Sequence, residues 1–241
     1  MEDRFIRTEK LLGTEALERL GRAHIAVFGV GGVGGYAVEA LARCGVGELT
    51  LVDSDCVAPS NINRQIIALC STVGKKKVDV AADRARDINP DIVVHVKDVF
   101  YLPETADQFD FSEYDYIVDA IDTVSGKMEL VKRAKEANVP IICSMGAGYK
   151  LDPSAFEVAD IYKTSVCPLA KSMRILCRKA GIEHLKVVYS RETPIQVGAL
   201  EDGGESDGQT RRKMSPASAI FAPAAAGLML AREVVHDIAG V

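Results

Sequence analysis

The stretch FGVGGVGGYAVEALARCGVGELTLVDSD, residues 28–55, places a glycine turn between two apolar runs. The first run covers residues 24–29 and the second covers 48–53, and the residues between them, 33–45, have apolar side chains at helical spacing. A strand, a glycine turn, a helix and a second strand make a βαβ unit. The stretch therefore predicts the start of a nucleotide-binding fold.

The glycines of this turn indicate where a phosphate would lie. Gly29, Gly31 and Gly34 form a GxGxxG pattern, with Gly32 as a further glycine inside it. A backbone without side chains lets phosphate oxygens approach the amide groups at a helix N-terminus. Asp53 ends the next strand, where a carboxylate commonly accepts hydrogen bonds from ribose hydroxyls. This pattern fits a dinucleotide and an adenine nucleotide equally well.

The rest of the chain alternates in the same way as far as residue 146. Further strands are predicted at 91–98, 114–122 and 140–146, and helices at 14–21, 75–89 and 126–139. Strands that alternate with helices of this length favour a parallel sheet covered on both faces. We therefore predict the α/β class, with a Rossmann-like, doubly wound, mostly parallel sheet.

Beyond residue 146 the pattern is less regular. It predicts a strand near 155–160, a helix near 168–180, a strand at 186–194, a polar glycine-rich loop at 198–216 and a buried helix from the apolar run at 219–231. We expect one adenylation domain over residues 1–241. About 20–146 would be its nucleotide-binding core, and about 147–241 a smaller C-terminal extension for substrate binding and dimer contacts.

Composition excludes several classes of protein. Of the 241 residues 48% are hydrophobic and the net charge is −5, which argues against disorder and against attachment to nucleic acid by overall positive charge. The first residues contain no apolar core of a signal peptide, and the longest apolar run has 13 residues, whereas a membrane span takes roughly 20. The six cysteines include no CxxC pair. We expect a cytoplasmic protein with reduced thiols, no structural zinc and no membrane association.

Polar residues after the second strand separate the two kinds of nucleotide. The segment APSNINRQI places Asn61, Asn63, Arg64 and Gln65 just beyond Asp53, close to the phosphate end of a bound nucleotide. The guanidinium group of an arginine is always charged and forms paired hydrogen bonds with phosphate oxygens. The segment therefore favours a polyphosphate ligand.

Two later motifs point in the same direction. VGKKKV places Lys77 at the start of a helix, while its two preceding lysines are expected on a solvated face. DAIDT brings Asp122 to the carboxyl edge of the sheet, where open α/β folds bind ligands and where a carboxylate beside a polyphosphate suits Mg²⁺. Arg64, Lys77 and Asp122 together indicate cleavage of a triphosphate, and hydride transfer needs none of them.

The histidines offer no general acid or base for an oxidoreductase. His24, His95, His184 and His236 are isolated in the sequence, and each is interpreted as structural. A nicotinamide-dependent oxidoreductase or a non-catalytic nucleotide sensor is accordingly disfavoured.

The motifs GVGGVGG, VDSD, NINRQ, VGKKKV and DAIDT, in this order, resemble the ubiquitin-activating-enzyme-like superfamily of ThiF, MoeB and HesA type. The resemblance implies that ATP is bound with Mg²⁺ and that a carboxylate is adenylated. It assigns Asp53, with Asp55 beside it, to the ribose end, and Asn61 and Arg64 to the phosphates. It also assigns Lys77 to charge developing at the α-phosphate and Asp122 to Mg²⁺ and pyrophosphate.

The N-terminal segment RFIRTEKLLG resembles the helix from which members of this superfamily extend an arginine into a neighbouring subunit. By position this arginine is Arg7, and Arg4 is the alternative. A solvated arginine with no such role is the third reading. The resemblance thus implies a homodimer.

Landmarks along nearly the whole chain resemble one branch, the tRNA threonylcarbamoyladenosine dehydratases. They are RFIRTEKLLG, GAGYKLDPSAFEVADIYKTSVCPLA and FAPAAAGLMLA. This resemblance implies ATP-dependent cyclisation of threonylcarbamoyladenosine next to the tRNA anticodon. The alternative is an adenylating enzyme for a ubiquitin-like sulfur-carrier protein, although such enzymes usually carry two CxxC pairs for zinc. A sulfur-transfer partner protein is a further expectation from the relatives.

Basic residues are candidates for tRNA contacts, and one cysteine is a candidate for covalent chemistry. Basic residues that could contact tRNA are Lys163, Lys171, Arg174, Arg178, Lys179 and the segment 211–213. Cys167 corresponds to the region where sulfur-transfer relatives use a cysteine, but no base lies near it in sequence. The predicted chemistry needs no protein nucleophile.

Overall fold

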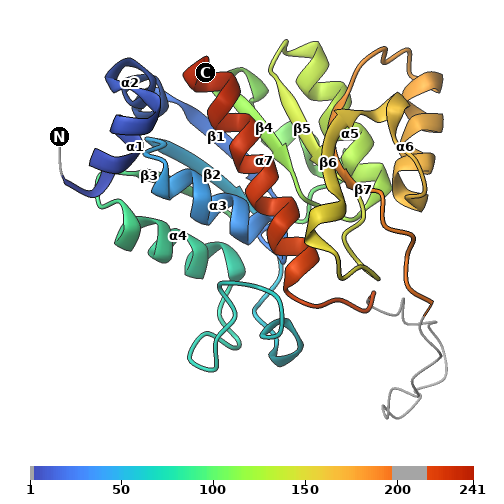
Figure 1. The fold of residues 1–241 in the computed structure, drawn as a ribbon, viewed down its shortest axis with the longest axis horizontal. Helices are drawn as coiled ribbons and strands as arrows, with labels where there is room; N and C mark the ends of the chain where they lie inside the picture. The colour runs from blue at the N-terminus through green and yellow to red at the C-terminus, as the bar shows by residue number, and fades with distance from the viewer. Residues whose placement is uncertain (1–2, 197–215) are drawn as a thin grey trace.

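The computed structural model of the chain describes residues 3–196 and 216–241, and Figure 1 shows one seven-stranded sheet with helices on both faces. The strand order is β3-β2-β1-β4-β5-β7-β6. The strands are β1 (His24–Phe28), β2 (Glu48–Val52), β3 (Val93–Lys97), β4 (Tyr116–Asp119), β5 (Ile141–Ser144), β6 (Phe156–Asp160) and β7 (Lys186–Ser190). Only β6 runs antiparallel to its neighbour. The predicted doubly wound, mostly parallel sheet is confirmed.

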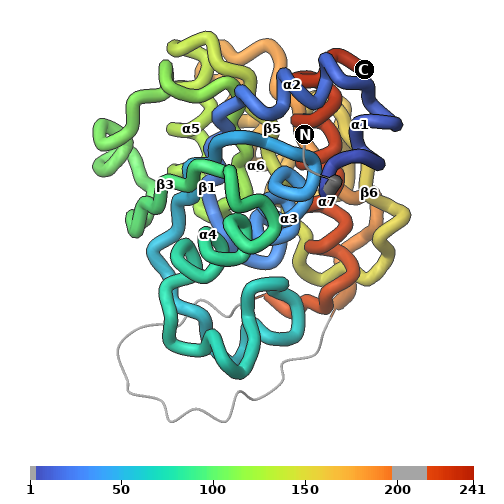
Figure 2. Tube along the Cα trace, turned by 90° about the vertical axis from the view of Figure 1, so that its left-hand side faces the viewer, coloured from blue at the N-terminus to red at the C-terminus, as the bar shows by residue number. Residues whose placement is uncertain are grey.

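The helices form two layers. They are α1 (Ile6–Leu12), α2 (Thr14–Arg22), α3 (Gly34–Arg43), α4 (Lys77–Ile88), α5 (Val124–Glu136), α6 (Pro168–Lys179) and α7 (Phe221–Ala239). Buried residues of α2, α3, α4 and α7 share one apolar core with the sheet, and those of α5 and α6 share another. Figure 2, turned by 90° from Figure 1, shows α3, α4 and α7 on the same side of the sheet.

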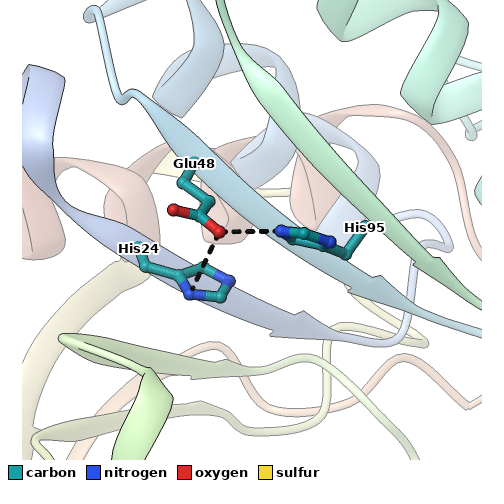
Figure 3. Close-up of side chains that lie close together, drawn as sticks. All are labelled: His24, Glu48 and His95. Carbon is teal, nitrogen blue, oxygen red and sulfur yellow. Dashed lines mark hydrogen bonds and ion pairs between the residues drawn. The ribbon is translucent and has the colours of Figure 1, made fainter.

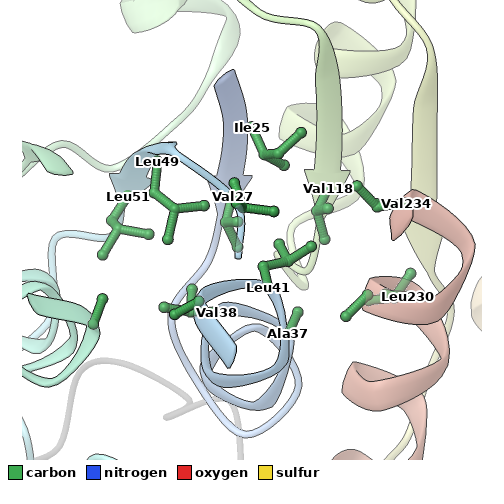
Figure 4. Packing of buried hydrophobic residues seen from close by; sticks show 14 of the residues in the cluster. Ile25, Val27, Ala37, Val38, Leu41, Leu49, Leu51, Val118, Leu230 and Val234 are labelled. Atoms are coloured by element: carbon green, nitrogen blue, oxygen red, sulfur yellow. The ribbon is translucent and has the colours of Figure 1, made fainter. Parts of the chain in front are cut away.

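Alternation along the central strand produces these two cores. Ile25 and Val27 of β1 point to the first layer, where Leu41 of α3 and Leu230 of α7 pack against them (Figure 4). Ala26 and Phe28 point to the second layer. All five residues of β1 are buried or half-buried, as expected of a parallel strand between two helical layers.

Helix α7 packs directly on the nucleotide-binding half of the chain. A methyl group added at Gly227 would lie 2.2 Å from the carbonyl oxygen of Val33, so the backbones of α7 and α3 touch at this point. The predicted helix from the run at 219–231 is thus confirmed, and its first turn contains Pro223, where no helical hydrogen bond is lost. The exposed side of α7 carries Phe221 and Leu228.

Two glycines of the predicted turn are required by packing. Gly29 has φ +88, and a Cβ there would lie 2.8 Å from the carbonyl oxygen of Ala120. A Cβ at Gly34 would lie 1.8 Å from the carbonyl oxygen of Gly29 itself. The turn therefore folds back on itself and against the end of β4, which a side chain at either position would prevent.

Some expected boundaries differ from the observed ones. The strand expected at 114–122 is β4, which ends at Asp119, because the chain leaves the sheet to form the loop before α5. The strand expected at 186–194 ends at Ser190. The glycine-rich loop expected at 198–216 lies outside the described residues except for its last position.

Candidate nucleotide site

The carboxyl ends of the strands surround a cleft of about 420 Å³. It opens between β1 and β4, where the strand order changes direction, and open α/β sheets bind their ligands at such a point. Ten of the predicted site residues line it: Gly29, Gly31, Gly32, Asp53, Asp55, Asn61, Arg64, Gln65, Lys77 and Asp122. Segments distant in sequence thus meet where the motifs predicted a nucleotide.

Asp53 connects the glycine turn to the loop after β2. Its carboxylate accepts hydrogen bonds from the backbone amides of Val30, at 2.8 Å, and Asp55, at 2.9 Å. The ammonium group of Lys77 lies 3.9 Å from Asp53 and 2.6 Å from the carboxylate of Asp55. Lys77 is 6% exposed, so it is a cation held at the cleft wall by two carboxylates.

The neighbouring lysine has a separate set of contacts. Lys76 donates to the carbonyl of Ser54 and to the carboxylate of Asp98. These contacts raise the pKa of Lys76, chiefly through the hydrogen bond to Asp98. The side chain of Lys76 is 39% exposed, and its contacts tie the start of α4 to two loops.

Arg64 lines the cleft from the loop after β2. Its guanidinium group donates to the carbonyl of Ser60 at 2.8 Å and to the side-chain oxygen of Asn63 at 2.9 Å. The side-chain amide of Asn63 in turn donates to the carbonyl of Ser218, just before α7. Asn63 itself does not line the cleft. In the structure it positions Arg64 and connects the loop to the C-terminal segment.

Asn61 and Gln65 stand beside Arg64. Asn61 accepts a hydrogen bond from the amide of Ala58 and so shapes its own loop. Gln65 is 7% exposed, and its side-chain oxygen has no hydrogen-bond partner among the described residues. A buried acceptor without a partner costs free energy unless a ligand or water donates to it. Gln65 therefore suits a hydroxyl or amino donor inside the cleft.

A buried ion pair supports the loop that carries Asp122. Lys127 and Asp119 are both fully buried, and their charged groups lie 2.9 Å apart. Lys127 also donates to the carbonyl of Ile121, and Asp119 accepts from the amide of Ile121. Asp122 remains exposed at the cleft, within 3.5 Å of the hydroxyl of Thr123. Asp119 is thus a structural residue, which leaves Asp122 as the carboxylate available to a ligand.

The cleft has further walls made by residues that were not predicted as site residues. They are contributed by Val99, Phe100, Tyr101, Ala120, Ile121, Ser144, Met145, Gly146, Ala147, Gly148, Leu169, Pro216, Ser218 and Pro223. Burial raises the pKa of the Tyr101 phenol, whose hydroxyl has no partner among the described residues. Tyr101 follows β3, so the rule that ligands bind beyond strand ends could have found it.

Known proteins are similar to this chain in sequence and in architecture. The sequence profile of the ThiF family matches residues 3–241. The chain belongs to the ThiF family. The predicted superfamily is thereby confirmed, and the matched segment includes every cleft motif described above.

Individual relatives of this ThiF-family chain agree over nearly its full length. The tRNA threonylcarbamoyladenosine dehydratase of Bacillus subtilis strain 168 is 44% identical over 242 residues, which cover 99% of this chain and 95% of that protein. Crystal structures of the E. coli tRNA N6-threonylcarbamoyladenosine dehydratase in complex with AMP and with ATP each align with a TM-score of 0.86. Their sequences are 35% and 34% identical, and the alignments cover 98% of this chain and 94% of those chains.

Besides Asn63, two predicted site residues of the ThiF-family chain do not line the cleft. Gly34 is buried in the packing of the turn and does not line the cleft. Arg7 lines a separate apolar groove of about 400 Å³ between α1, α3 and α7, whose lining residues include Leu11 and Leu228. Within one subunit Arg7 and the nucleotide cleft are therefore separate.

Two of the basic residues expected to contact tRNA have partners within the chain, and Cys167 is buried. Arg174 donates to the carbonyl of Thr164, and Arg178 lies over the ring of Tyr162. Cys167 is 2% exposed and precedes the first residue of α6. Residues 211–213 lie outside the described part of the chain.

The assignment of isolated histidines was wrong for two of the four. The sheet places His24 on β1 and His95 on β3, on either side of β2, with their ring centroids 5.5 Å apart. His184 and His236 remain separate from this pair, each near one aspartate.

Proposed function

We propose that this protein catalyses the ATP-dependent dehydration, by cyclisation, of threonylcarbamoyladenosine next to the anticodon of tRNA. The observation that carries the proposal is the 44% identity to a tRNA threonylcarbamoyladenosine dehydratase over 99% of this chain. The cleft supports it, because Arg64, Lys77 and Asp122 surround one space at the carboxyl edge of the sheet. The enzyme is thus an ATP-dependent ligase that forms an acyl-adenylate.

The first step activates the threonine carboxylate. An oxygen of this carboxylate attacks the α-phosphorus of ATP, a new C–O–P link forms, and pyrophosphate leaves. Negative charge increases on the phosphate oxygens as the reaction proceeds, and fixed cations lower the barrier to such a step. Lys77 stabilises the α-phosphate and Arg64, with Asn61, the β- and γ-phosphates. Asp53 holds the ribose end, and the glycine turn lies beneath the phosphates with Gln65 beside Gly31.

The ion pair between Lys77 and Asp55 defines how the cleft changes when ATP binds. The ammonium group of Lys77 lies 2.6 Å from the carboxylate of Asp55. Asp55 is mostly exposed, so a phosphate oxygen can take its place beside Lys77 while the carboxylate of Asp55 returns to water at little cost. Lys77 therefore exchanges a carboxylate for a phosphate, and Asp53 keeps it in place.

Magnesium fits the oxygen donors at the cleft. The Asp122 carboxylate is exposed there, unlike that of Asp119, which is bound to Lys127. Mg²⁺ is usually held by one or two carboxylates together with substrate phosphates. Asp122 would hold the ion, which supplies further positive charge to the departing pyrophosphate.

The second step closes a ring within the substrate. A ureido group of the modified nucleoside attacks the activated carbonyl, and AMP leaves with the oxygen that the carboxylate has lost. The net change in the nucleoside is the loss of one water. Because both reacting groups belong to one molecule, the protein needs to exclude water and hold the substrate in place, and it needs no nucleophile of its own.

The decisive experiment measures AMP and the nucleoside together. The protein is incubated with radiolabelled ATP, Mg²⁺ and tRNA that carries threonylcarbamoyladenosine, and digested nucleosides are weighed by mass spectrometry. We expect AMP formation that depends on this tRNA and a modified nucleoside lighter by one water. Unmodified tRNA is the control.

A sulfur-carrier protein is the alternative acceptor, and the same assay tests it. AMP release that occurs only with a carrier protein, with no change in nucleoside mass, would overturn the proposal. The absence of CxxC pairs in the sequence argues against this alternative. A sulfur-transfer protein is a further proposed partner of the dehydratase, and it would bind a surface outside the cleft.

The protein acts as a homodimer in which Arg7 completes the partner's cleft. None of the residues of α1 is buried within one subunit, and Leu11 is 82% exposed beside the apolar groove that Arg7 lines. A second copy packed on this groove would cover the apolar surface. The subunit remains one adenylation domain, and its residues 147–241 contribute to both the tRNA surface and the dimer contact.

Subunit mixing tests the role of Arg7. Arg7→Ala and Lys77→Met proteins should each be inactive, while a refolded or co-expressed mixture should recover about one quarter of the normal activity. In half of the dimers one cleft would have both an intact Lys77 and an intact Arg7. A mixture that stays inactive, although heterodimers are detected, would show that Arg7 acts in its own subunit or not at all.

The cellular setting follows from the substrate. None of the helices in the described ranges, 3–196 and 216–241, is long and apolar enough to cross a membrane. We place the enzyme in the cytoplasm, where mature tRNA is modified. Lys163, Lys171 and Lys179 remain the candidates for contacts with tRNA phosphates.

A further inference from the structure

A second polar cluster lies at the amino ends of the strands, at the opposite edge of the sheet from the cleft. It contains His24 on β1, Glu48 on β2 and His95 on β3, and Figure 3 shows the three side chains directed toward one another. His24 is paired in register with Glu48, and His95 with Thr50, two residues farther along β2. The parallel register therefore puts all three side chains on one face.

The possible ligand atoms of the cluster are close enough to share one ion. The Nε2 atom of His95 lies 2.7 Å from a carboxylate oxygen of Glu48, and the Nδ1 atom of His24 lies 3.6 Å from the same oxygen. Ligand atoms of the three residues all lie within 4.8 Å of one another. A tetrahedral zinc ion bound at 2.0–2.2 Å separates its ligand atoms by roughly 3.3 Å, so small side-chain rotations are sufficient.

Thr50 orients the ring of His24. Its hydroxyl lies 2.8 Å from the Nε2 atom of His24. With Nε2 occupied by Thr50, Nδ1 is the ring nitrogen of His24 that faces Glu48, at 3.6 Å. An orienting partner on the second ring nitrogen is typical of metal-binding histidines.

The surroundings hold the ring of His24 in place while keeping an entry path for an ion. The edge of Tyr114 packs on the ring, and Asp115 accepts from the backbone amide of His24. Side-chain exposure rises from 13% at His24 to 46% at His95, so an ion can enter from the side of β3.

We propose that His24, Glu48 and His95 bind a divalent transition-metal ion, Zn²⁺, at the amino edge of the sheet. The ligands are Nδ1 of His24, the Glu48 carboxylate and Nε2 of His95, and water completes the coordination on the open side. Two imidazoles and one carboxylate suit zinc, whereas Mg²⁺ and Ca²⁺ prefer oxygen ligands. The ion would clamp the first residues of β1 and β2 to the edge strand β3.

The first test measures zinc affinity of the whole protein. Protein stripped with a chelator is titrated with Zn²⁺ in the presence of excess Mg²⁺, which occupies sites made of oxygen ligands alone. We expect one zinc ion per chain. Loss of a residue that orients a ligand typically weakens metal binding by roughly 10- to 100-fold, and Thr50→Val should fall within that range. Loss of a ligand should weaken zinc binding by more than this in each of the variants His24→Gln, Glu48→Gln and His95→Gln.

Matched variants exclude binding elsewhere. His184 lies 3.5 Å from Asp160 and is a histidine–carboxylate pair without a second imidazole, so His184→Gln should leave the affinity unchanged. The double variant Cys56→Ser, Cys70→Ser removes the two exposed cysteines. Zinc affinity that is normal in the His24→Gln and His95→Gln proteins, or lost in the cysteine variant, would overturn the proposal.

A second measurement uses the unmodified protein and does not depend on the folding of any variant. Nitrogen-15 NMR of the imidazole rings should show Zn²⁺-dependent shifts at Nδ1 of His24 and Nε2 of His95, with none at His184. Co²⁺ in place of zinc should give a visible spectrum without thiolate charge-transfer bands. Unchanged imidazole signals at one equivalent of Zn²⁺ would refute the site, whatever the outcome for tRNA modification.

Discussion

Replacing Lys77 with methionine should lower kcat/KM for tRNA-dependent AMP formation by about two to three orders of magnitude. Fixed donors and cations at a developing anionic charge are typically worth this much. Lys77 is 6% exposed, lies between Asp53 and Asp55, and lines the cleft, so no water can replace its charge at the same position. Radiolabelled AMP, quantified under single-turnover conditions, separates this effect from product release.

The adjacent lysine is the control for this prediction. Lys76→Met removes the same charge one residue earlier, at a side chain that contacts Ser54 and Asp98 and does not line the cleft. It should retain activity within a few-fold, and both proteins should show the circular dichroism spectrum of the original. Near-normal turnover by Lys77→Met would mean that the phosphates lie elsewhere in the cleft.

Breaking the ion pair beneath the Asp122 loop should have the largest effect on stability. Lys127→Met leaves the fully buried carboxylate of Asp119 without its partner and removes the donor to the carbonyl of Ile121. Removal of one member of a buried pair costs about 3–5 kcal/mol of unfolding free energy. Urea denaturation followed by circular dichroism should show this loss as a lower midpoint with an unchanged slope.

Two further variants separate the buried charge from a general effect of mutation. Asp119→Asn combined with Lys127→Met removes both charges and keeps an oxygen that can accept from the amide of Ile121, so it should be more stable than Lys127→Met alone. Arg22→Ala breaks a surface pair with Glu18 and should cost at most about 1 kcal/mol. Equal losses for Lys127→Met and the double variant would rule out an unpaired charge as the cause.

The nucleotide half was predictable because its signals are local. Strand periodicity, the glycine turn and the acidic residue at a strand end occur within residues 24–53, and they place Asp53 correctly at the cleft. Lys77 and Asp122 were predictable from motifs at strand and helix ends, because parallel strands bring all their carboxyl ends to one edge. Their roles toward ATP remain predictions.

Long-range side-chain contacts were not predictable in the same way. Nothing in the sequence shows that Lys127 of α5 points back to Asp119 of β4, or that Asn63 reaches Ser218 near the start of α7. The histidine cluster requires the registers of three strands, and a shift of one residue would put His95 on the other face. Gly34 fits the phosphate pattern, but its missing side chain is already required by the carbonyl of Gly29.

The position of α7 has a consequence for how the protein is made on the ribosome. Its apolar side fills the core above α3, and Pro223 in its first turn is part of the cleft wall. A nascent chain that has emerged only as far as β5 contains every phosphate motif, yet it exposes the apolar face of α3 and lacks this wall. Binding of ATP should thus begin only after residues 221–239 have docked. ATP would therefore bind and stabilise only those chains in which this helix has been synthesised.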